Sequence, residues 1–147
     1  MTLPKIDIPN ALIPKTDILT GGQPTPQQLE QAKQAGYRTI VNLRPPAEMN
    51  EWNEDDKARQ LGFNYISIPV AGAAGLTAEN TDKLHAVLEN PANHPLIVHC
   101  ASGNRVGALF ALHAARYEGK TVEEAIRWGK TAGLTGLEAE VRQHLTS

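Results

Sequence analysis

The sequence predicts a single α/β domain with a central, mainly parallel β-sheet flanked by helices. Short apolar runs at residues 39–43, 65–68 and 96–99 alternate with longer amphipathic segments that carry helix-capping residues. This alternation is typical of a parallel sheet, because each helical crossover returns the chain to the same end of the sheet. A chain of 147 residues matches one domain, residues 1–147, and is long enough to bury a core without disulfides or metals.

The N-terminal part is expected to lead into this domain. Prolines interrupt residues 1–20 at three positions, so this stretch is predicted to be an irregular or extended lead-in. Thr25 is then a typical N-cap for a helix over residues 26–35, because proline and a capping-box glutamine follow it in the first turn. Residues 39–43 form the first predicted strand, which two prolines stop after Arg44.

The middle of the chain repeats the alternation. A loop over residues 47–53 leads to a helix over 54–61 and a second strand over 65–68. An Ala/Gly-rich segment, residues 71–75, is expected to be a flexible loop. A helix over 77–88 follows it, with a threonine as its cap.

The third predicted strand, residues 96–99, is short and apolar up to its last residue, which is typical of a central strand. Helices are expected over residues 103–117, 121–131 and 137–145. In parallel sheets the ligand lies beyond the carboxyl ends of the strands. Three segments are expected to meet at that edge, and they begin at Arg44, Ala71 and Cys100.

Composition and charge exclude several classes of function. The net charge is −2 and no two basic residues are adjacent, which argues against nucleic-acid binding. No segment is apolar for long enough to be a signal peptide or a membrane span. The one cysteine cannot form an internal disulfide, so we expect a cytoplasmic protein. The histidines show no metal-ligand spacing, and neither a metal nor a cofactor is expected.

Residues 98–107, Val-His-Cys-Ala-Ser-Gly-Asn-Arg-Val-Gly, carry the strongest chemical signal. A buried strand delivers Cys100 to a tight turn that leads into a helix, so backbone amides are expected to converge at the helix N-terminus. Such a nest binds an oxyanion, and the same field lowers the pKa of a thiol. Arg105 adds a planar guanidinium for two phosphate oxygens. The predicted phosphate-binding residues of this loop are Ala101, Ser102, Gly103, Asn104 and Arg105.

A thiolate beneath a bound phosphate is placed for in-line attack, so Cys100 is predicted to be the nucleophile of a phosphocysteine mechanism. The alternative is a buried structural cysteine with a surface arginine. His99 is a supporting residue that either tunes the thiol or bonds to the backbone. Arg44 is either a second cationic ligand or a solvated strand terminus, since its strand ends at the same edge.

These residues resemble the signature of the protein tyrosine phosphatase superfamily, His-Cys-x-x-Gly-x-x-Arg followed by Ser or Thr. The wider chain, over about residues 19–140, is similar to a bacterial family related to the dual-specificity phosphatases. The matching features are Gly22-Gln23-Pro24, Gly36, Asn42-Leu43-Arg44, Ile68-Pro69-Val70 and His99 to Arg105. The resemblance implies a cysteine-phosphatase fold with Cys100 as nucleophile and Arg105 as phosphate ligand.

The chain departs from that family at three points. Four residues separate Cys100 from Arg105 where the superfamily has five, which removes one amide donor. Val106 stands where the family has a hydroxyl that steadies the thiolate, and Ser102 is the nearest substitute. The loop after the second strand lacks the aspartate that serves dual-specificity enzymes as general acid. Of the acids that follow Arg44, Glu48 is chosen as the candidate acid, and a solvated loop acid is the alternative. The other acids near the site by topology are Glu51, Glu54, Asp55 and Asp56.

The expected function is a hydrolase: a cysteine-dependent phosphatase for a phosphorylated small molecule or a phosphotyrosine-type substrate. Aryl phosphates and phosphoanhydrides are favoured over phosphoserine, because their leaving groups need little protonation. Two alternatives stay open. Cys100 to Arg105 also resembles the six-residue loop of rhodanese-type sulfurtransferases, although helices rather than a strand are expected after residue 121. The second alternative is a repurposed site, in which the cysteine loop binds anions or carries out redox chemistry with little or no phosphatase turnover.

Overall fold

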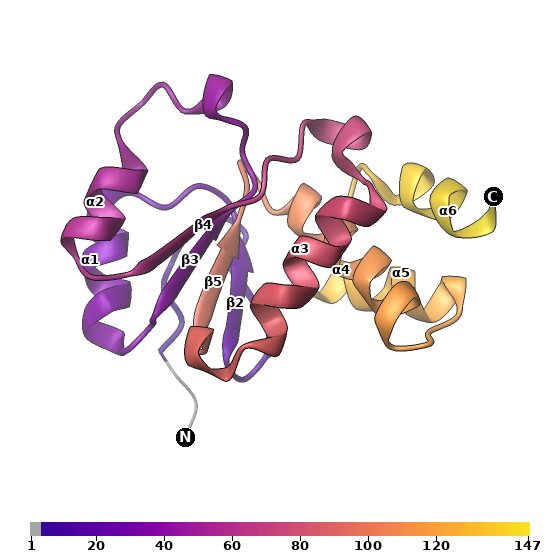
Figure 1. The fold of residues 1–147 in the computed structure, drawn as a ribbon, viewed down its shortest axis with the longest axis horizontal. Coiled ribbons are helices and arrows are strands. Elements are labelled where there is room, and N and C mark those ends of the chain that lie inside the picture. Colours follow the sequence, from indigo (N-terminus) through magenta and orange to yellow (C-terminus); the bar gives the residue numbers. More distant parts are fainter. Residues whose placement is uncertain (1–3) are drawn as a thin grey trace.

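The computed structural model describes residues 4–147 and shows a five-stranded sheet between two layers of helices (Figure 1). The strands are β1 (Leu12–Lys15), β2 (Ile18–Gly21), β3 (Thr39–Asn42), β4 (Asn64–Ser67) and β5 (Leu96–His99). Their order is β1-β2-β5-β3-β4; β1 pairs antiparallel with β2, and the other neighbours are parallel. The prediction of a mainly parallel sheet with residues 96–99 at its centre is confirmed.

The predicted helices are also confirmed, with small changes at their ends. They are α1 (Pro26–Ala35), α2 (Glu54–Gln60), α3 (Ala78–Glu89), α4 (Asn104–Tyr117), α5 (Val122–Thr131) and α6 (Glu138–Thr146). Helices α1 and α2 lie on one face of the sheet, and α3 to α6 lie on the other (Figure 1). Threonine capping boxes begin α1 and α5, as their sequences predict.

Three short 3₁₀ turns lie in the connections: η1 (Pro46–Glu48), η2 (Gly72–Gly75) and η3 (Pro91–Asn93). The second of these corrects the expectation of a flexible loop over residues 71–75. Gly75 is buried there, and a Cβ atom on it would lie 2.7 Å from the Cα atom of Val70. Close packing against the chain after β4 therefore fixes the end of this segment at Gly75, while Ala71, Ala73 and Ala74 are exposed.

The described part of the N-terminal lead-in corrects the prediction for residues 1–20. It contributes two strands, and β2 is buried throughout, pairing from Ile18 opposite Leu96 to Gly21 opposite His99. The prolines do not prevent this, because none lies within β2. Pro14 lies in the edge strand β1, where a missing N–H is tolerated.

Side chains alternate between the two faces of the sheet and divide the core into two parts. Leu19, Ile40 and Ile97 pack with α1 and α2, and their neighbours Ile18 and Val41 pack beneath α3 and α4. Burial on both faces explains why the central strands are apolar at nearly every position. Within residues 4–147, no helix combines the length and apolar character that a membrane span requires.

Candidate active site

The carboxyl ends of the parallel strands meet at one edge, as predicted. Backbone hydrogen bonds continue the sheet there: the amide of Leu43 donates to His99, the amide of Val70 to Leu43, and the amide of Cys100 to Gly21, at 2.9, 2.8 and 3.1 Å. These bonds hold the segments after β2, β3, β4 and β5 in a fixed arrangement. The side chains that follow the strands therefore converge on the start of α4.

The Cys100 loop is a strand-to-helix junction with a glycine at its end. Gly103 is the N-cap of α4 and has φ of 102°, a left-handed conformation that favours glycine. Its amide lies 3.0 Å from the Cys100 Sγ atom and donates to it, and Cys100 is 1% exposed. The first amide to donate within the helix is that of Gly107, so the amides of Asn104 to Val106 have no intrahelical acceptor. This edge of the loop is suited to an anion.

The residues that follow β2 pack against the Cys100 loop. The amide of Gln23 donates to the Ala101 carbonyl oxygen at 3.1 Å, and a Cβ atom on Gly22 would lie 2.5 Å from that oxygen. Only glycine fits at position 22 without displacing the loop. This contact gives the Gly22-Gln23-Pro24 motif a structural role that its sequence position alone did not reveal.

Two predicted loop ligands also hold neighbouring segments of the chain. The Asn104 Oδ1 atom accepts hydrogen bonds from the amides of Thr135 and Leu137, at 2.9 and 3.2 Å, and so anchors the connection between α5 and α6. Ser102 is exposed, and its carbonyl oxygen accepts from the Asn10 side chain at 2.8 Å. The Asn104 side chain is therefore occupied by contacts outside the Cys100 loop.

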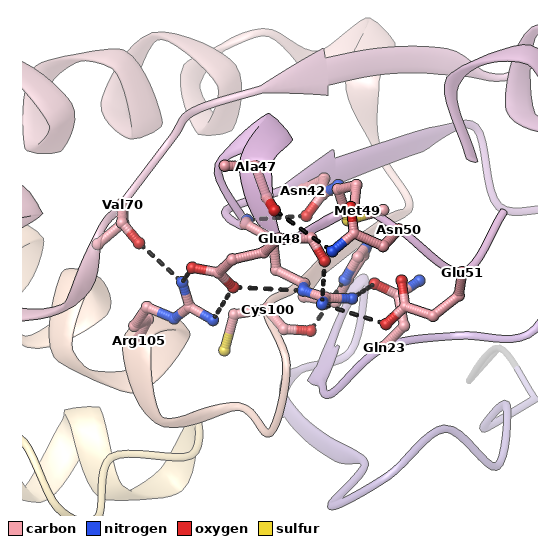
Figure 2. A network of polar contacts seen from close by, with 12 residues as sticks. Gln23, Asn42, Ala47, Glu48, Met49, Asn50, Glu51, Val70, Cys100 and Arg105 are labelled. Atoms are coloured by element: carbon pink, nitrogen blue, oxygen red, sulfur yellow. Dashed lines mark hydrogen bonds and ion pairs between the residues drawn. The ribbon is translucent and has the colours of Figure 1, made fainter. Parts of the chain in front are cut away.

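The Arg105 guanidinium lies beside Cys100 and binds Glu48 (Figure 2). Its two terminal nitrogens donate to the two carboxylate oxygens of Glu48 at 2.9 Å each, and one of them also donates to the Val70 carbonyl oxygen at 2.9 Å. The bond from Arg105 holds the pKa of Glu48 below its usual range, and Glu48 raises the pKa of Arg105. In this arrangement Glu48 is an ionised partner of Arg105.

Arg44 binds the same carboxylate from the other side. It is 8% exposed, and its Nε atom lies 3.4 Å from a carboxylate oxygen of Glu48. Its terminal nitrogens donate to the Gln23 side chain, the Glu48 carbonyl oxygen and Glu51, at 2.8, 2.7 and 3.2 Å. The structure thus places Arg44 in the site rather than in solvent. The Glu48 carboxylate is therefore bound by two guanidinium groups, Arg44 and Arg105.

His99 pairs with an acid that sequence reasoning placed near the site without giving it a role. Its Nε2 atom lies 2.6 Å from the Glu54 Oε2 atom, and both side chains are fully buried. The other Glu54 oxygen accepts from Gln23 at 2.6 Å. Burial raises the pKa of Glu54, but His99, Gln23 and Tyr65 bind the carboxylate and the net pKa is lowered. Glu54 opens α2 in a run of three acids, so nothing local distinguishes it as the buried one.

A cavity of about 420 Å³ adjoins Arg44 on the side of β3 and β4. Met49 and Trp52 contribute apolar surface to it, and Asn42, Asn50 and Tyr65 contribute polar groups. Trp52, which follows the Glu48 loop, is thus one of the residues that line this cavity. A cavity of this size can hold a small organic group.

The chain is similar to several phosphatase-related proteins. A profile of the family described as "DSP-PTPase phosphatase fused to NAD+ Kinase" matches residues 10–143. The Beta-lactamase hydrolase-like protein of Xylella fastidiosa (strain Temecula1) is 33% identical over 95 residues, which are 62% of this chain and 22% of that protein. The chain therefore spans about a fifth of the length of this relative.

Solved structures show the same fold. One is the crystal structure of a protein from Neisseria meningitidis that carries a phosphatase assignment. It matches with a TM-score of 0.74 and 25% sequence identity, and the match covers 92% of this chain and 95% of the Neisseria chain. A second such protein, from Shewanella putrefaciens, matches with a TM-score of 0.68 and 19% sequence identity. This match covers 95% of this chain and 93% of the Shewanella chain. The two helices that follow α4 here, α5 and α6, are those expected for the phosphatase branch rather than for a rhodanese.

Proposed function

This chain belongs to the family described as "DSP-PTPase phosphatase fused to NAD+ Kinase", and on that premise we propose that it is a cysteine-dependent phosphatase. The observation that carries the proposal is the meeting of Arg105 and Arg44 on one carboxylate beside Cys100. Two guanidinium groups and a helix N-terminus provide the donors that a phosphate group needs. In this proposal Cys100, which lies beside Arg105, is the nucleophile that attacks phosphorus.

The first chemical step is assigned to Cys100. Its sulfur, as a thiolate, forms a bond to phosphorus while the bond from phosphorus to the leaving oxygen breaks. The Gly103 amide donates a hydrogen bond to Sγ, and the Arg105 guanidinium lies beside it, so both donors adjoin the attacking atom. In the second step a water oxygen forms a bond to phosphorus, the sulfur–phosphorus bond breaks, and inorganic phosphate leaves.

Glu48 is proposed as the acid of the first step, after substrate displaces it. A phosphate dianion would take over the Arg105 and Arg44 donors, so the Glu48 carboxyl group would lose its cations and face a negative charge. Both changes raise the pKa of a carboxyl group and allow it to hold a proton for the leaving oxygen. The resulting carboxylate then accepts the proton of the attacking water in the second step. Glu48 thus binds the two guanidinium groups before the substrate arrives and transfers the proton afterwards.

The proposed substrate class follows from the weak proton donation that is expected of Glu48. Aryl phosphates and phosphoanhydrides leave with little help from a proton donor, so we propose a phosphotyrosine-type compound or a phosphorylated small molecule. The cavity beside Arg44 would hold the group that carries the phosphate. Met49 and Trp52 provide its apolar surface, which suits an aromatic or other partly apolar group.

Release of phosphate from p-nitrophenyl phosphate tests the proposal. We expect turnover by the natural chain and none by Cys100→Ser. Parallel assays measure thiocyanate formation from thiosulfate and cyanide, and the binding of inorganic phosphate. Sulfur transfer without phosphate release would overturn the proposal in favour of a sulfurtransferase. Tight phosphate binding without either reaction would overturn it in favour of an anion-binding site.

A further inference from the structure

Arg44, one of the two guanidinium groups of the proposed phosphate site, is held by a side chain that the mechanism does not use. This side chain is Gln23, in the segment between β2 and α1. Its Oε1 atom accepts a hydrogen bond from Arg44 Nη1 at 2.8 Å. Its Nε2 atom donates to Glu54 Oε1 at 2.6 Å and to the Pro24 carbonyl oxygen at 2.9 Å. Both ends of the Gln23 amide group therefore have partners.

These partners fix which end of the Gln23 amide faces Arg44. A guanidinium group only donates hydrogen bonds, so the amide oxygen must face Arg44 and the amide nitrogen must face Glu54. The Glu54 side chain is fully buried and also contacts the His99 Nε2 atom at 2.6 Å, so it is held in one position. The carboxylate of Glu54 thus orients the Gln23 amide, and the amide presents its oxygen to Arg44.

The oxygen of Gln23 holds Arg44 without neutralising its charge. Arg44 also binds the Glu48 side chain and carbonyl oxygen, but the proposed mechanism displaces Glu48 when phosphate binds. Its contact with Glu51 is weak, because the Glu51 side chain is 52% exposed and solvent screens the pair. Gln23 lies on the side of Glu48 that faces away from Arg105 (Figure 2). It can therefore keep its hydrogen bond to Arg44 while phosphate takes the place of the carboxylate.

The backbone of Gln23 also contacts the Cys100 loop. Its amide donates to the Ala101 carbonyl oxygen at 3.1 Å, next to the close approach of Gly22 to the same oxygen. One residue therefore holds both the loop that leads to Arg105 and the guanidinium group of Arg44. Two guanidinium groups can bind one phosphate only if their separation and orientation are fixed, and Gln23 connects the two segments that carry them.

We propose that Gln23 is a positioning residue, whose side-chain oxygen holds the Arg44 guanidinium group in the orientation that lets it bind one phosphate together with Arg105. The inference rests on the proposed function only in taking these two guanidinium groups as the phosphate site. Gln23 acts through Arg44, and Glu54 acts one step further away by orienting the Gln23 amide.

A double-mutant cycle tests the proposal. Calorimetric titration measures the Kd for inorganic phosphate in the natural chain, Gln23→Met, Arg44→Met and the double variant. Loss of one hydrogen bond should raise Kd about fivefold in Gln23→Met, but by less than about twofold when Arg44 is already methionine. Gln31→Met, at an exposed position of α1, is the control and should bind phosphate like the natural chain. An unchanged Kd in Gln23→Met, or an equal rise in both backgrounds, overturns the proposal, because a merely structural role would not depend on Arg44.

A second measurement needs no variant and decides the matter if Gln23→Met does not fold. In a crystal structure of the natural chain with inorganic phosphate, Arg44 should contact the phosphate and keep its hydrogen bond to Gln23. Phosphate bound by Arg105 alone, or an Arg44 that has left Gln23 to reach it, overturns the proposal. Neither measurement depends on turnover. A chain that binds phosphate in this way but releases none from p-nitrophenyl phosphate would defeat the proposed function and leave the role of Gln23 intact, whereas a natural chain that binds no phosphate would overturn both.

Discussion

Glu48 contacts Arg105 through two parallel hydrogen bonds of 2.9 Å, the arrangement by which a guanidinium group binds two oxygens of a phosphate. Under the proposed function, an internal carboxylate therefore occupies donors that the substrate needs. Binding of a phosphate group would then be an exchange of one anion for another. The exchange is favoured by the charge of a phosphate dianion, which exceeds that of a single carboxylate.

The first prediction concerns this exchange. Glu48→Gln removes the competing charge, so inorganic phosphate should bind more tightly. Because the Glu48 side chain is 36% exposed, solvent screens the pair, and we expect a gain of about fivefold, equivalent to about 1 kcal/mol. Calorimetric titration with phosphate measures it. Weaker binding in Glu48→Gln than in the natural chain would show that Glu48 assists the resting anion site instead of occupying it.

The second prediction separates the proton-donor role of Glu48 from its competitor role. Glu48→Gln should slow the turnover of phenyl phosphate far more than that of p-nitrophenyl phosphate, because phenolate is the poorer leaving group. The ratio of the two kcat values is the quantity to measure. Glu51→Gln removes the neighbouring acid of the same loop and provides the comparison. An unchanged ratio in Glu48→Gln would assign the proton to another group.

The third prediction concerns Arg44. Arg44→Lys keeps the positive charge but loses the planar fork that bridges Gln23 and Glu48. We expect KM for p-nitrophenyl phosphate to rise about tenfold, as expected when a charge-assisted hydrogen bond is lost. Arg38→Lys, an exposed arginine just before β3, should leave KM unchanged. Equal KM values for the two variants would remove Arg44 from the phosphate site.

The fourth prediction concerns stability against pH. Burial opposes the ionisation of Glu54, but its hydrogen-bonding partners lower its pKa in the folded state. A lowered pKa contributes stability that is present above the ordinary value of about 4.3 and is lost as the pH falls through the folded value. The urea midpoint of the natural chain should therefore fall more steeply below about pH 4.3 than that of Glu54→Gln. Parallel curves would mean that Glu54 has no lowered pKa.

The fifth prediction concerns the loop support. Gly22→Ala places a Cβ atom 2.5 Å from the Ala101 carbonyl oxygen, so the loop must shift. Phosphate binding should fall by at least tenfold, a loss of about 1.4 kcal/mol. Gly136→Ala is the control, because its Cβ atom would meet the Asn104 side chain at an ordinary 3.6 Å. Full phosphate affinity in Gly22→Ala would show that the loop tolerates the displacement.

The sequence predicted elements whose signals are local. Thr25 and Thr121 begin helices where capping boxes indicate them, and the order of strand, cysteine, glycine and arginine placed the Cys100 loop at a strand-to-helix junction. β2 was missed because only Ile18 and Leu19 mark it as apolar. Its identity as a strand depends on pairing with β5, nearly eighty residues away in the chain.

The polar contacts of the candidate site could not be predicted from local sequence signals. His99 and Glu54 are 45 positions apart, and one of three consecutive acids is buried only because α2 packs against the sheet at that point. The choice for Arg44 between solvent and site depends on the path of the loop that carries Glu48. Such contacts are set by tertiary packing, which leaves no periodic pattern in the residues concerned.

Chemical trapping of the reaction intermediate tests the central claim most directly. The chain is mixed with p-nitrophenyl phosphate and quenched in acid within the first turnover, and the peptide that contains Cys100 is analysed by mass spectrometry. The account predicts a phosphoryl group on Cys100, which is absent after the substrate is consumed. Release of phosphate during a first turnover in which Cys100 is never phosphorylated would contradict it.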